Sequence, residues 1–276
     1  MAGILYVVST PIGNVEDMTQ RARRILAEVA VVAAEDTRRS GALLDALNIE
    51  ASFVSYHDHN EKERTPQLIK RLQQGESVAL VSDAGTPLVS DPGYRLVRAC
   101  QEANIQVVPV PGASAVLAAL AVAGLPTDTF AFVGFLPNKG RQREQAVREC
   151  LQKRTTSVLF EAPHRVLDLL QVFIEQGGGE REMTLCRELT KQFETIHRAT
   201  VAELAHRVAQ DANQQKGEIV LVLAGAPEVQ FEQAEWQPLA RRLLQELPAA
   251  RVAKVLADFT GEKRQALYQW LTQQEE

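Results

Sequence analysis

Short apolar segments recur along the first part of the chain, and most of them are rich in valine and isoleucine. We expect strands over 4–8, 29–33, 52–55, 78–82 and 105–110. Segments that are apolar throughout, rather than alternating with polar residues, are typical of a sheet covered on both faces. Helical patterns lie between several of them, for example where Thr65 and Pro66 have the positions of a cap and a first-turn proline and Gly75 ends the helix. The alternation predicts βαβ units and a parallel sheet.

A second series of strands and helices follows Pro126. We expect strands over 130–135, 157–160, 183–187 and 218–223. We expect helices over about 141–152, 165–176 and 201–210. From about 236 to 276 only helical signals occur, broken at Pro248 and Gly261, which predicts a three-helix appendage. The expected division is therefore an N-terminal α/β domain over 1–115, a C-terminal α/β domain over 116–228 and a helical appendage over 229–276.

Composition narrows the class of protein. Apolar residues make up 45% and charged residues 24%, as in globular chains and unlike disordered or fibrous ones. The three cysteines lie far apart, so no disulfide framework or zinc knuckle follows from them and a reduced cytosol fits best. The N-terminus has no basic region typical of a signal peptide, and the longest apolar run, 116–125, is half as long as a membrane span requires. We expect a cytoplasmic protein with no membrane segment.

Small and polar residues follow four of the five N-terminal strands. These loops cover 9–14, 35–38, 83–93 and 111–115. In an open parallel sheet, ligands bind beyond the carboxyl ends of the strands, so the four loops would share one rim. Glycine and proline in three of them would let a ligand approach the backbone closely. Neither G-x-G-x-x-G after the first strand nor G-x-x-x-x-G-K-[ST] anywhere occurs, so a dinucleotide Rossmann site and a P-loop NTPase are unsupported.

Two further clusters carry groups that bind ligands. His57 and His59 flank Asp58, which suits a substrate-facing loop, a polar surface loop or a metal ion; no third ligand or second shell can be read from the sequence, and we expect no metal. The formal net charge is -5, yet 139–154 is locally basic, which makes it a candidate phosphate-binding surface or a solvated helix face. Its charged residues are Lys139, Arg141, Arg143, Arg148, Lys153 and Arg154 against Glu144 and Glu149.

Seven motifs, in chain order over about 4–225, resemble one protein family. It is the tetrapyrrole-methylase superfamily, and more narrowly its branch of small-subunit rRNA (cytidine-2'-O)-methyltransferases. The motifs are Ser9-Thr10-Pro11-Ile12-Gly13-Asn14, Ala34-Glu35-Asp36-Thr37-Arg38, Ser82-Asp83-Ala84-Gly85-Thr86-Pro87 with Asp91-Pro92-Gly93, Pro111-Gly112-Ala113-Ser114-Ala115, Phe160-Glu161-Ala162-Pro163-His164-Arg165, Arg187-Glu188-Leu189-Thr190-Lys191 with Glu194, and Lys216-Gly217-Glu218.

The resemblance implies two α/β domains, with a mainly parallel N-terminal sheet and a mixed C-terminal sheet, and S-adenosylmethionine bound in the cleft between them. It also implies a homodimer that methylates a ribose 2'-hydroxyl of a cytidine in the decoding region of 16S rRNA, on free RNA or the 30S subunit. The implied cofactor-binding residues are Asp83, Gly85, Thr86, Pro87, Ser114, Ala115, Phe160, Glu161 and Gly217. The expected RNA-binding residues are Ser9, Pro11, Asn14, Glu35, Thr37, Arg38, His57, His59, Asn60, Arg141, Arg143 and Arg148.

The chemistry calls for in-line alignment of the hydroxyl with the methyl group, and a nearby group that helps to remove the hydroxyl proton. The candidates are Glu161, Asp83, His57 and Lys191, and the sequence does not rank them. Two other functions stay open: a methylase of the same superfamily that acts on a tetrapyrrole ring carbon, and a ribosome-binding protein that has kept the cleft without catalysis. The basic segment favours RNA, because a tetrapyrrole site needs a roomy cleft and no phosphate contacts.

Overall fold

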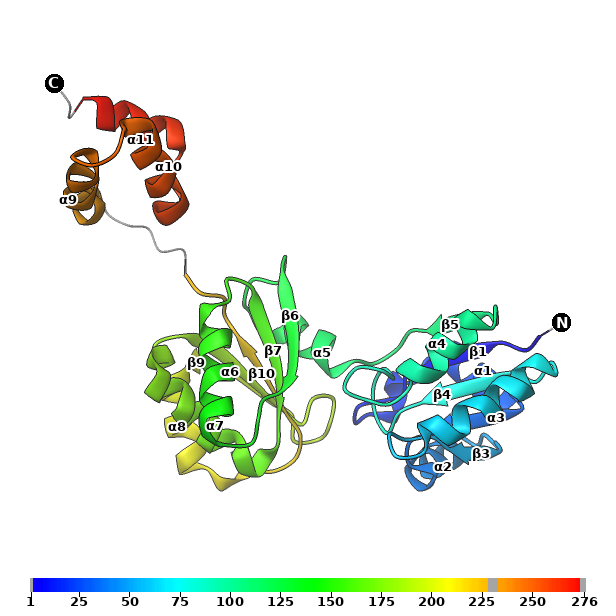
Figure 1. Cartoon of the computed structure of the whole chain (residues 1–276). Coiled ribbons are helices and arrows are strands. Elements are labelled where there is room, and N and C mark those ends of the chain that lie inside the picture. Colours follow the sequence, from blue (N-terminus) through cyan, green and yellow to red (C-terminus); the bar gives the residue numbers. More distant parts are fainter. Residues whose placement is uncertain (1, 228–232, 274–276) are drawn as a thin grey trace. The chain divides into compact units, whose positions relative to one another are not determined.

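The structure is a computed structural model that describes residues 2–227 and 233–273 (Figure 1). The chain divides into two compact units, Met1–Gly225 and Ala226–Glu276. The first unit contains two five-stranded sheets. We call residues 2–114 the N lobe, residues 115–225 the C lobe and the second unit the tail. Among the described residues, no helix has the length and apolar character needed to cross a bilayer.

The N lobe is built on a parallel sheet with the strand order β3-β2-β4-β1-β5. The strands are β1 (Leu5–Val8), β2 (Val31–Ala34), β3 (Phe53–Ser55), β4 (Val78–Val81) and β5 (Val107–Val110). Every strand expected in this half is present, and each pairing is parallel. The predicted parallel sheet is therefore confirmed.

Helices cover both faces of this sheet. Helices α1 (Gln20–Glu28) and α2 (Thr37–Ala46) pack on one face, and α3 (Glu61–Gln73) and α4 (Tyr94–Glu102) on the other. Successive side chains of a strand point to opposite faces. In β2, accordingly, Val32 and Ala34 join the first core cluster and Val31 and Ala33 join the second. Burial on both faces explains why β2 and β4 are apolar throughout.

Helix α3 begins earlier than the sequence indicated. Thr65 and Pro66 were expected at its start, but the helix starts at Glu61 and contains Pro66 in its interior. The Thr65 hydroxyl does not cap the helix; it lies 3.0 Å from the buried Tyr56 hydroxyl. Side-chain hydrogen bonds of Asn60 to the loop before the helix fix the actual start. Gly75, with φ +96°, follows the end of the helix, as predicted.

The C lobe contains a mixed sheet with the order β6-β7-β10-β8-β9. The strands are β6 (Phe130–Phe135), β7 (Thr156–Glu161), β8 (Glu182–Arg187), β9 (Thr195–Thr200) and β10 (Ile219–Leu223). β6 and β7 are parallel, and the other pairings are antiparallel. The predicted mixed sheet is confirmed. The strand β9 was not predicted, because this edge strand is only partly buried and lacks an apolar run.

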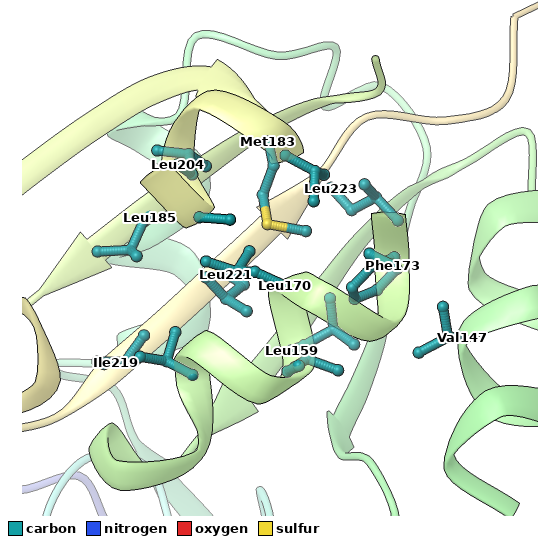
Figure 2. Close-up of a cluster of buried hydrophobic side chains, with 14 of the residues drawn as sticks. Val147, Leu159, Leu170, Phe173, Met183, Leu185, Leu204, Ile219, Leu221 and Leu223 are labelled. Atoms are coloured by element: carbon teal, nitrogen blue, oxygen red, sulfur yellow. The ribbon is translucent and has the colours of Figure 1, made fainter. Parts of the chain in front are cut away.

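The two faces of the C-lobe sheet have separate cores. Helices α6 (Gly140–Gln152), α7 (Val166–Phe173) and α8 (Val201–Gln210) pack on one face, where Figure 2 shows Leu159, Leu221 and Phe173 among the buried side chains. Helix α5 (Ala115–Val122) packs on the other face, against Val220 and neighbouring side chains. Ile12 of the N lobe belongs to this second cluster, so the two lobes share apolar contacts.

The described residues of the tail form three helices around a core of their own. The helices are α9 (Gln233–Leu244), α10 (Ala249–Thr260) and α11 (Arg264–Thr272). Pro248 precedes α10, and Gly261 ends it in a left-handed conformation with φ +75°. Both breaks were predicted from the sequence. Trp236, Leu256 and Leu267 are buried together at the centre of the unit.

Candidate functional site

The chain changes direction at the middle of the N-lobe sheet. β1 and β4 are neighbours, but β1 is followed by a crossover to β2 and β4 by a crossover to β5, in opposite directions along the sheet. Such a switch point opens a crevice beyond the carboxyl ends of the strands, where open parallel sheets bind ligands. The loops that border this crevice are 9–14, 83–93 and 111–115.

Hydrogen bonds join these loops to one another. The backbones of Thr10 and Gly85 exchange two hydrogen bonds, at 2.9 and 3.0 Å. The Thr86 hydroxyl donates to the carbonyl of Ala113 at 3.1 Å and lies 2.9 Å from the Ser9 hydroxyl. The amide of Asp36, in the fourth loop, donates to the Asp83 carboxylate at 3.0 Å. The shared rim that the sequence predicted is therefore present.

A cleft of about 390 Å³ lies between this rim and the C lobe. Pockets for small molecules have volumes of roughly 300–1,000 Å³. Of the residues expected to bind a cofactor, the cleft is lined by Gly85, Thr86, Ser114, Ala115, Phe160, Glu161 and Gly217. Asp83 and Pro87 are not among its lining residues. The walls include further apolar side chains from both lobes, Ile12, Val89, Phe135 and Val220.

The loop after β4 has an unusual backbone. Leu88 and Ser90 have φ values of +72° and +67°, although neither is glycine. Gly85 and Gly93 also have positive φ values. Side chains other than glycine rarely adopt this conformation, and such strain is concentrated at functional sites. The loop therefore reaches the cleft along a path that costs conformational energy.

Glu161 is enclosed by arginines. Its carboxylate lies 3.3 Å from Arg143 Nη2 and 3.0 Å from Arg165 Nε, and its Oε1 accepts the Ala162 amide at 2.8 Å. The side chain is fully buried. Both guanidinium groups pair with this carboxylate, so Glu161 is engaged in ion pairs within the C lobe. Its position fixes the turn over 160–163, which lines the cleft.

Asp83 is also occupied by other groups. Its carboxylate accepts the Asp36 amide and lies 3.1 Å from Arg39 Nη1. Burial raises the pKa of the neighbouring Glu35, and the charge of Asp83 raises it further. Asp83 thus joins the loop after β4 to the loop after β2.

Lys191 bridges two glutamates at the edge of the cleft. Its Nζ lies 2.8 Å from Glu188 and 3.0 Å from Glu218. Burial lowers the pKa of Lys191, but the two hydrogen-bonded carboxylates outweigh this effect and raise it. The amine therefore stays protonated at neutral pH and cannot accept a proton. It can act as a fixed positive charge.

Asp91 lines the cleft, although its sequence context predicted no role for it. Burial raises its pKa to about 6, and the nearby carboxylates Glu35, Asp83 and Asp58 add to this shift; a hydrogen bond from Ser82 opposes it. A perturbed carboxyl group in a cleft marks a candidate functional residue. The sequence signal was its place in Asp91-Pro92-Gly93, a turn beside the glycine-rich loop.

Residues expected to face RNA lie in different environments. Ser9 and Pro11 are buried, whereas Asn14 is exposed and its side chain accepts the Glu16 amide. Glu35 and Thr37 are partly exposed. Arg38 is exposed and pairs with Asp36 at 2.8 Å.

The loop from His57 to Asn60 is held internally. The Asn60 side chain accepts the His57 amide at 2.9 Å and donates to the carbonyl of Ser55 at 3.1 Å. His59 is exposed, and its ring meets that of His57 edge to face at 5.9 Å. Within the described residues, no group of three or more His, Cys, Asp or Glu side chains is placed to hold a metal ion.

The basic segment on α6 is divided between the surface and the interior. Arg141 is exposed, and Arg148 is half-exposed with hydrogen bonds to Gln145 and Gln176. Arg143 is only 3% exposed and is bound to Glu161 and to the carbonyl of Asn138. A buried guanidinium cannot contact an RNA phosphate, so the expectation for Arg143 is corrected. Arg143 has the helical spacing of the buried residues Val147 and Cys150, and this spacing could have indicated from the sequence that it points inward.

Comparisons with known proteins place nearly the whole chain in one protein family. The family described as "Tetrapyrrole (Corrin/Porphyrin) Methylases" matches residues 4–205, and the "RsmI C-terminal HTH domain" matches residues 231–275. The chain is 48% identical to the "Ribosomal RNA small subunit methyltransferase I" of Pseudomonas aeruginosa, over 99% of this chain and 98% of that protein. It is 46% identical to the protein of the same name from Vibrio cholerae, over 98% and 94%.

A solved structure has the same fold at low sequence identity. Uroporphyrin-III C-methyl transferase from Thermus thermophilus, complexed with S-adenyl homocysteine, matches with a TM-score of 0.55 and 20% identity. The match covers 80% of this chain and 97% of that one.

Proposed function

Because this chain belongs to the tetrapyrrole methylase family, we propose that it transfers a methyl group from S-adenosylmethionine to RNA. The acceptor is the 2'-hydroxyl of a cytidine ribose in the decoding region of 16S rRNA. The observation that carries the proposal is the near full-length identity to rRNA small-subunit methyltransferases, together with a cleft bordered by the motif residues of both lobes.

The residues around the cleft fit the methyl donor. S-adenosylmethionine supplies an electrophilic methyl group on a positively charged sulfur, and it also carries a carboxylate and a flat adenine ring. The first turn of α5, at Ser114 and Ala115, offers backbone amides to the carboxylate. Ile12, Phe160 and Val220 provide apolar walls for the ring.

The proposal has a direct test. Tritiated methyl transfer from S-adenosylmethionine is measured on 30S subunits, free 16S rRNA and a porphyrinogen mixture, each from cells that lack the enzyme. Alkali-resistant label in 30S RNA supports ribose 2'-O-methylation. Label only in the porphyrinogen favours the tetrapyrrole methylase, and binding of the donor and of 30S subunits without any label favours the ribosome-binding protein.

Substitution of Gly217 by alanine is expected to weaken donor binding about tenfold or more and to destabilise the C lobe. Gly217 lines the cleft with φ +81°, and a Cβ atom there would lie 2.4 Å from the Glu188 carboxyl carbon. Glu188 cannot give way easily because it holds Lys191 and the Glu218 amide. Titration calorimetry with S-adenosylmethionine and thermal unfolding measure the two effects.

Gly177→Ala is the matched control for this substitution. Gly177 has nearly the same φ value, +83°, but its Cβ would meet nothing within 4 Å. We therefore expect Gly177→Ala to show the backbone strain alone, with unchanged donor affinity. Equal affinities for both variants would mean that the clash with Glu188 has no effect on the cleft.

The proposed RNA-binding surface consists of Arg38, Arg141 and Arg148. We expect Arg141→Ala and Arg148→Ala each to weaken binding to 30S subunits and to reduce the slope of log K against log salt by about one unit, because each removes a phosphate contact. Binding is measured by filter retention over a range of salt concentrations. Arg24→Ala, at an exposed arginine paired with Glu28 on α1, serves as the control. Unchanged slopes would make α6 a solvated helix face.

The proposal also covers the localisation, the oligomeric state and the division of the chain into regions. We propose a cytoplasmic homodimer in which α5 contributes to the interface, because Leu117 and Val122 on this apolar helix are 59% and 44% exposed. We assign the RNA-facing loops to residues 1–115 and the dimer contacts to 116–228, with both regions forming the cleft. We assign the helical appendage to 229–276, of which 229–232 and 274–276 lie outside the described residues.

A further inference from the structure

Three carboxylate side chains belong to residues that line the cleft: Asp91, Glu161 and Glu218. Glu161 lies between two arginines, and Glu218 lies 3.0 Å from the Lys191 amine. Among the residues that the structure describes, Asp91 forms no ion pair with a cation; its hydrogen-bond partner is the buried Ser82 hydroxyl. Asp91 is thus the carboxylate of this set that is available to take up a proton.

Asp91 also borders a second hollow on the outer side of the N lobe. This surface groove runs between α3 and α4 and includes Tyr94, whose side chain is largely exposed. Asp91 lines both the groove and the cleft. It therefore stands where a methyl donor in the cleft would meet an acceptor that arrives from the surface.

The backbone on both sides of Asp91 is held in place. Ser90, which precedes it, has a φ of +67°, and Gly93, which follows Pro92, has a φ of +137°. A Cβ atom on Gly93 would lie 2.7 Å from Leu80 Cδ2, so the turn packs closely on the end of β4. A strained conformation that the surrounding structure maintains is a sign that the position of the side chain matters.

We propose that Asp91 is the general base that accepts the proton of the substrate hydroxyl. This inference rests on the proposed function. The ribose 2'-oxygen forms a bond to the methyl carbon while the bond between methyl and sulfur breaks, and the electron pair of that bond stays on sulfur. The hydroxyl proton passes to the Asp91 carboxylate and then to water. The products are the 2'-O-methyl ribose and neutral S-adenosylhomocysteine.

The surroundings of Asp91 suit this role. A base works best when its pKa lies near the working pH, and burial raises the pKa of Asp91 to about 6. The groups that face it from neighbouring elements are Glu35, Asp58 and Asp83, with Glu161 and Glu218 across the cleft and Glu61, Lys62, Arg95, Arg98 and Glu102 along the groove. The charges cancel within each of the ion pairs Glu61–Arg95 and Glu102–Arg98. The carboxylates near Asp91 therefore keep the local electrostatic field negative.

Asp91→Asn tests the inference. We expect the single-turnover rate with 30S subunits to fall by about 10²–10⁴, while S-adenosylmethionine and 30S subunits bind as tightly as before. For the wild-type enzyme, kcat/KM should rise with pH and level off above about pH 6, and the variant should lose this ionisation. Formate should restore part of the rate to Asp91→Ala. Asp45→Asn, at an exposed carboxylate on α2, should keep the wild-type rate and profile.

Stability provides a readout that does not depend on activity. The carboxyl pKa is higher in the folded state, about 6, than the ordinary 3.8, so the folded state binds the proton more tightly between these values. Wild-type stability therefore falls as pH rises through this window, and the penalty is complete above it. Because asparagine carries no charge, Asp91→Asn should be more stable than the wild type above about pH 6 and equal to it below about pH 4.

The outcomes separate the inference from the proposed function. If the wild-type enzyme labels 30S RNA and Asp91→Asn does so at the same single-turnover rate, Asp91 is not the base. A slow variant that also loses donor affinity, with no rescue by formate, would make Asp91 a binding residue and overturn the inference as well. If the wild-type enzyme labels no 30S or 16S RNA, the proposed function fails, and the role of Asp91 fails with it.

Discussion

Replacement of Glu161 by alanine is expected to destabilise the C lobe by about 3–5 kcal/mol and to abolish measurable donor binding. The substitution leaves Arg143 and Arg165 without their shared carboxylate. Burial already lowers the pKa of Arg143, and the charge of Glu161, more than that of Asp168, opposes this effect. An uncompensated buried guanidinium forces the α6 end of the lobe to open, and the turn over Phe160–Pro163 loses its anchor. Urea unfolding and titration calorimetry measure the two losses.

Two further variants serve as controls for this prediction. Glu161→Gln keeps the shape and the hydrogen-bond acceptor but not the charge, so we expect a smaller loss of stability. Glu149→Ala, at an exposed glutamate on α6, should change stability by no more than about 0.5 kcal/mol. If Glu161→Ala unfolds at the same urea concentration as the wild type, the arginines must have found other partners, and the carboxylate is not what holds the turn.

The second large effect concerns the tail. Trp236 is buried in its core, and its ring meets that of Trp270 edge to face at 4.9 Å. Truncation of a buried tryptophan costs about 3–5 kcal/mol, and a unit of this size has little stability to lose. We therefore expect Trp236→Ala to unfold the tail while the Met1–Gly225 unit stays folded and still binds S-adenosylmethionine.

The chain offers a convenient signal for this experiment. Trp236 and Trp270 are the two tryptophans of the sequence, and both are in the tail, so the fluorescence of the variant comes from Trp270 alone. Its emission should shift to the red, with calorimetry confirming donor binding. Leu239→Ala, at a half-exposed leucine on α9, should leave the emission unshifted. An unshifted spectrum in Trp236→Ala would mean that the tail core tolerates the loss.

The sequence predicted the fold well where one physical rule governs a segment. Doubly covered strands must be apolar throughout, and β2 and β4, which are buried along their whole length, follow that rule. Pro248 before α10 and Gly261 after it break the tail helices at the expected places. Where two requirements compete, the prediction failed. Thr65 looks like a cap, but its hydroxyl contacts Tyr56, and β9 escaped notice because an edge strand needs no continuous apolar face.

The candidate site was predictable in location but less so in the roles of its residues. The loops at the carboxyl ends of β1, β4 and β5 meet as parallel topology requires. The roles depend on pairing across the fold, and sequence spacing does not reveal that Arg143 reaches Glu161 or that Lys191 reaches Glu218. Once those pairs form, charge is neutralised at the expected catalytic groups. Asp91 is distinguished only in the folded structure, where it lines the cleft and none of the described cations forms an ion pair with it.

The strand order has a consequence for synthesis on the ribosome. β10 lies between β7 and β8, so the strand made last occupies the centre of the C-lobe sheet. Until Ile219–Leu223 has left the exit tunnel, β7 and β8 each present an unpaired edge, and the cleft lacks the wall that residues 217–220 provide. Exposed edges invite pairing with other chains. A nascent chain of this protein therefore passes through an aggregation-prone stage that ends only after four-fifths of its length has been translated.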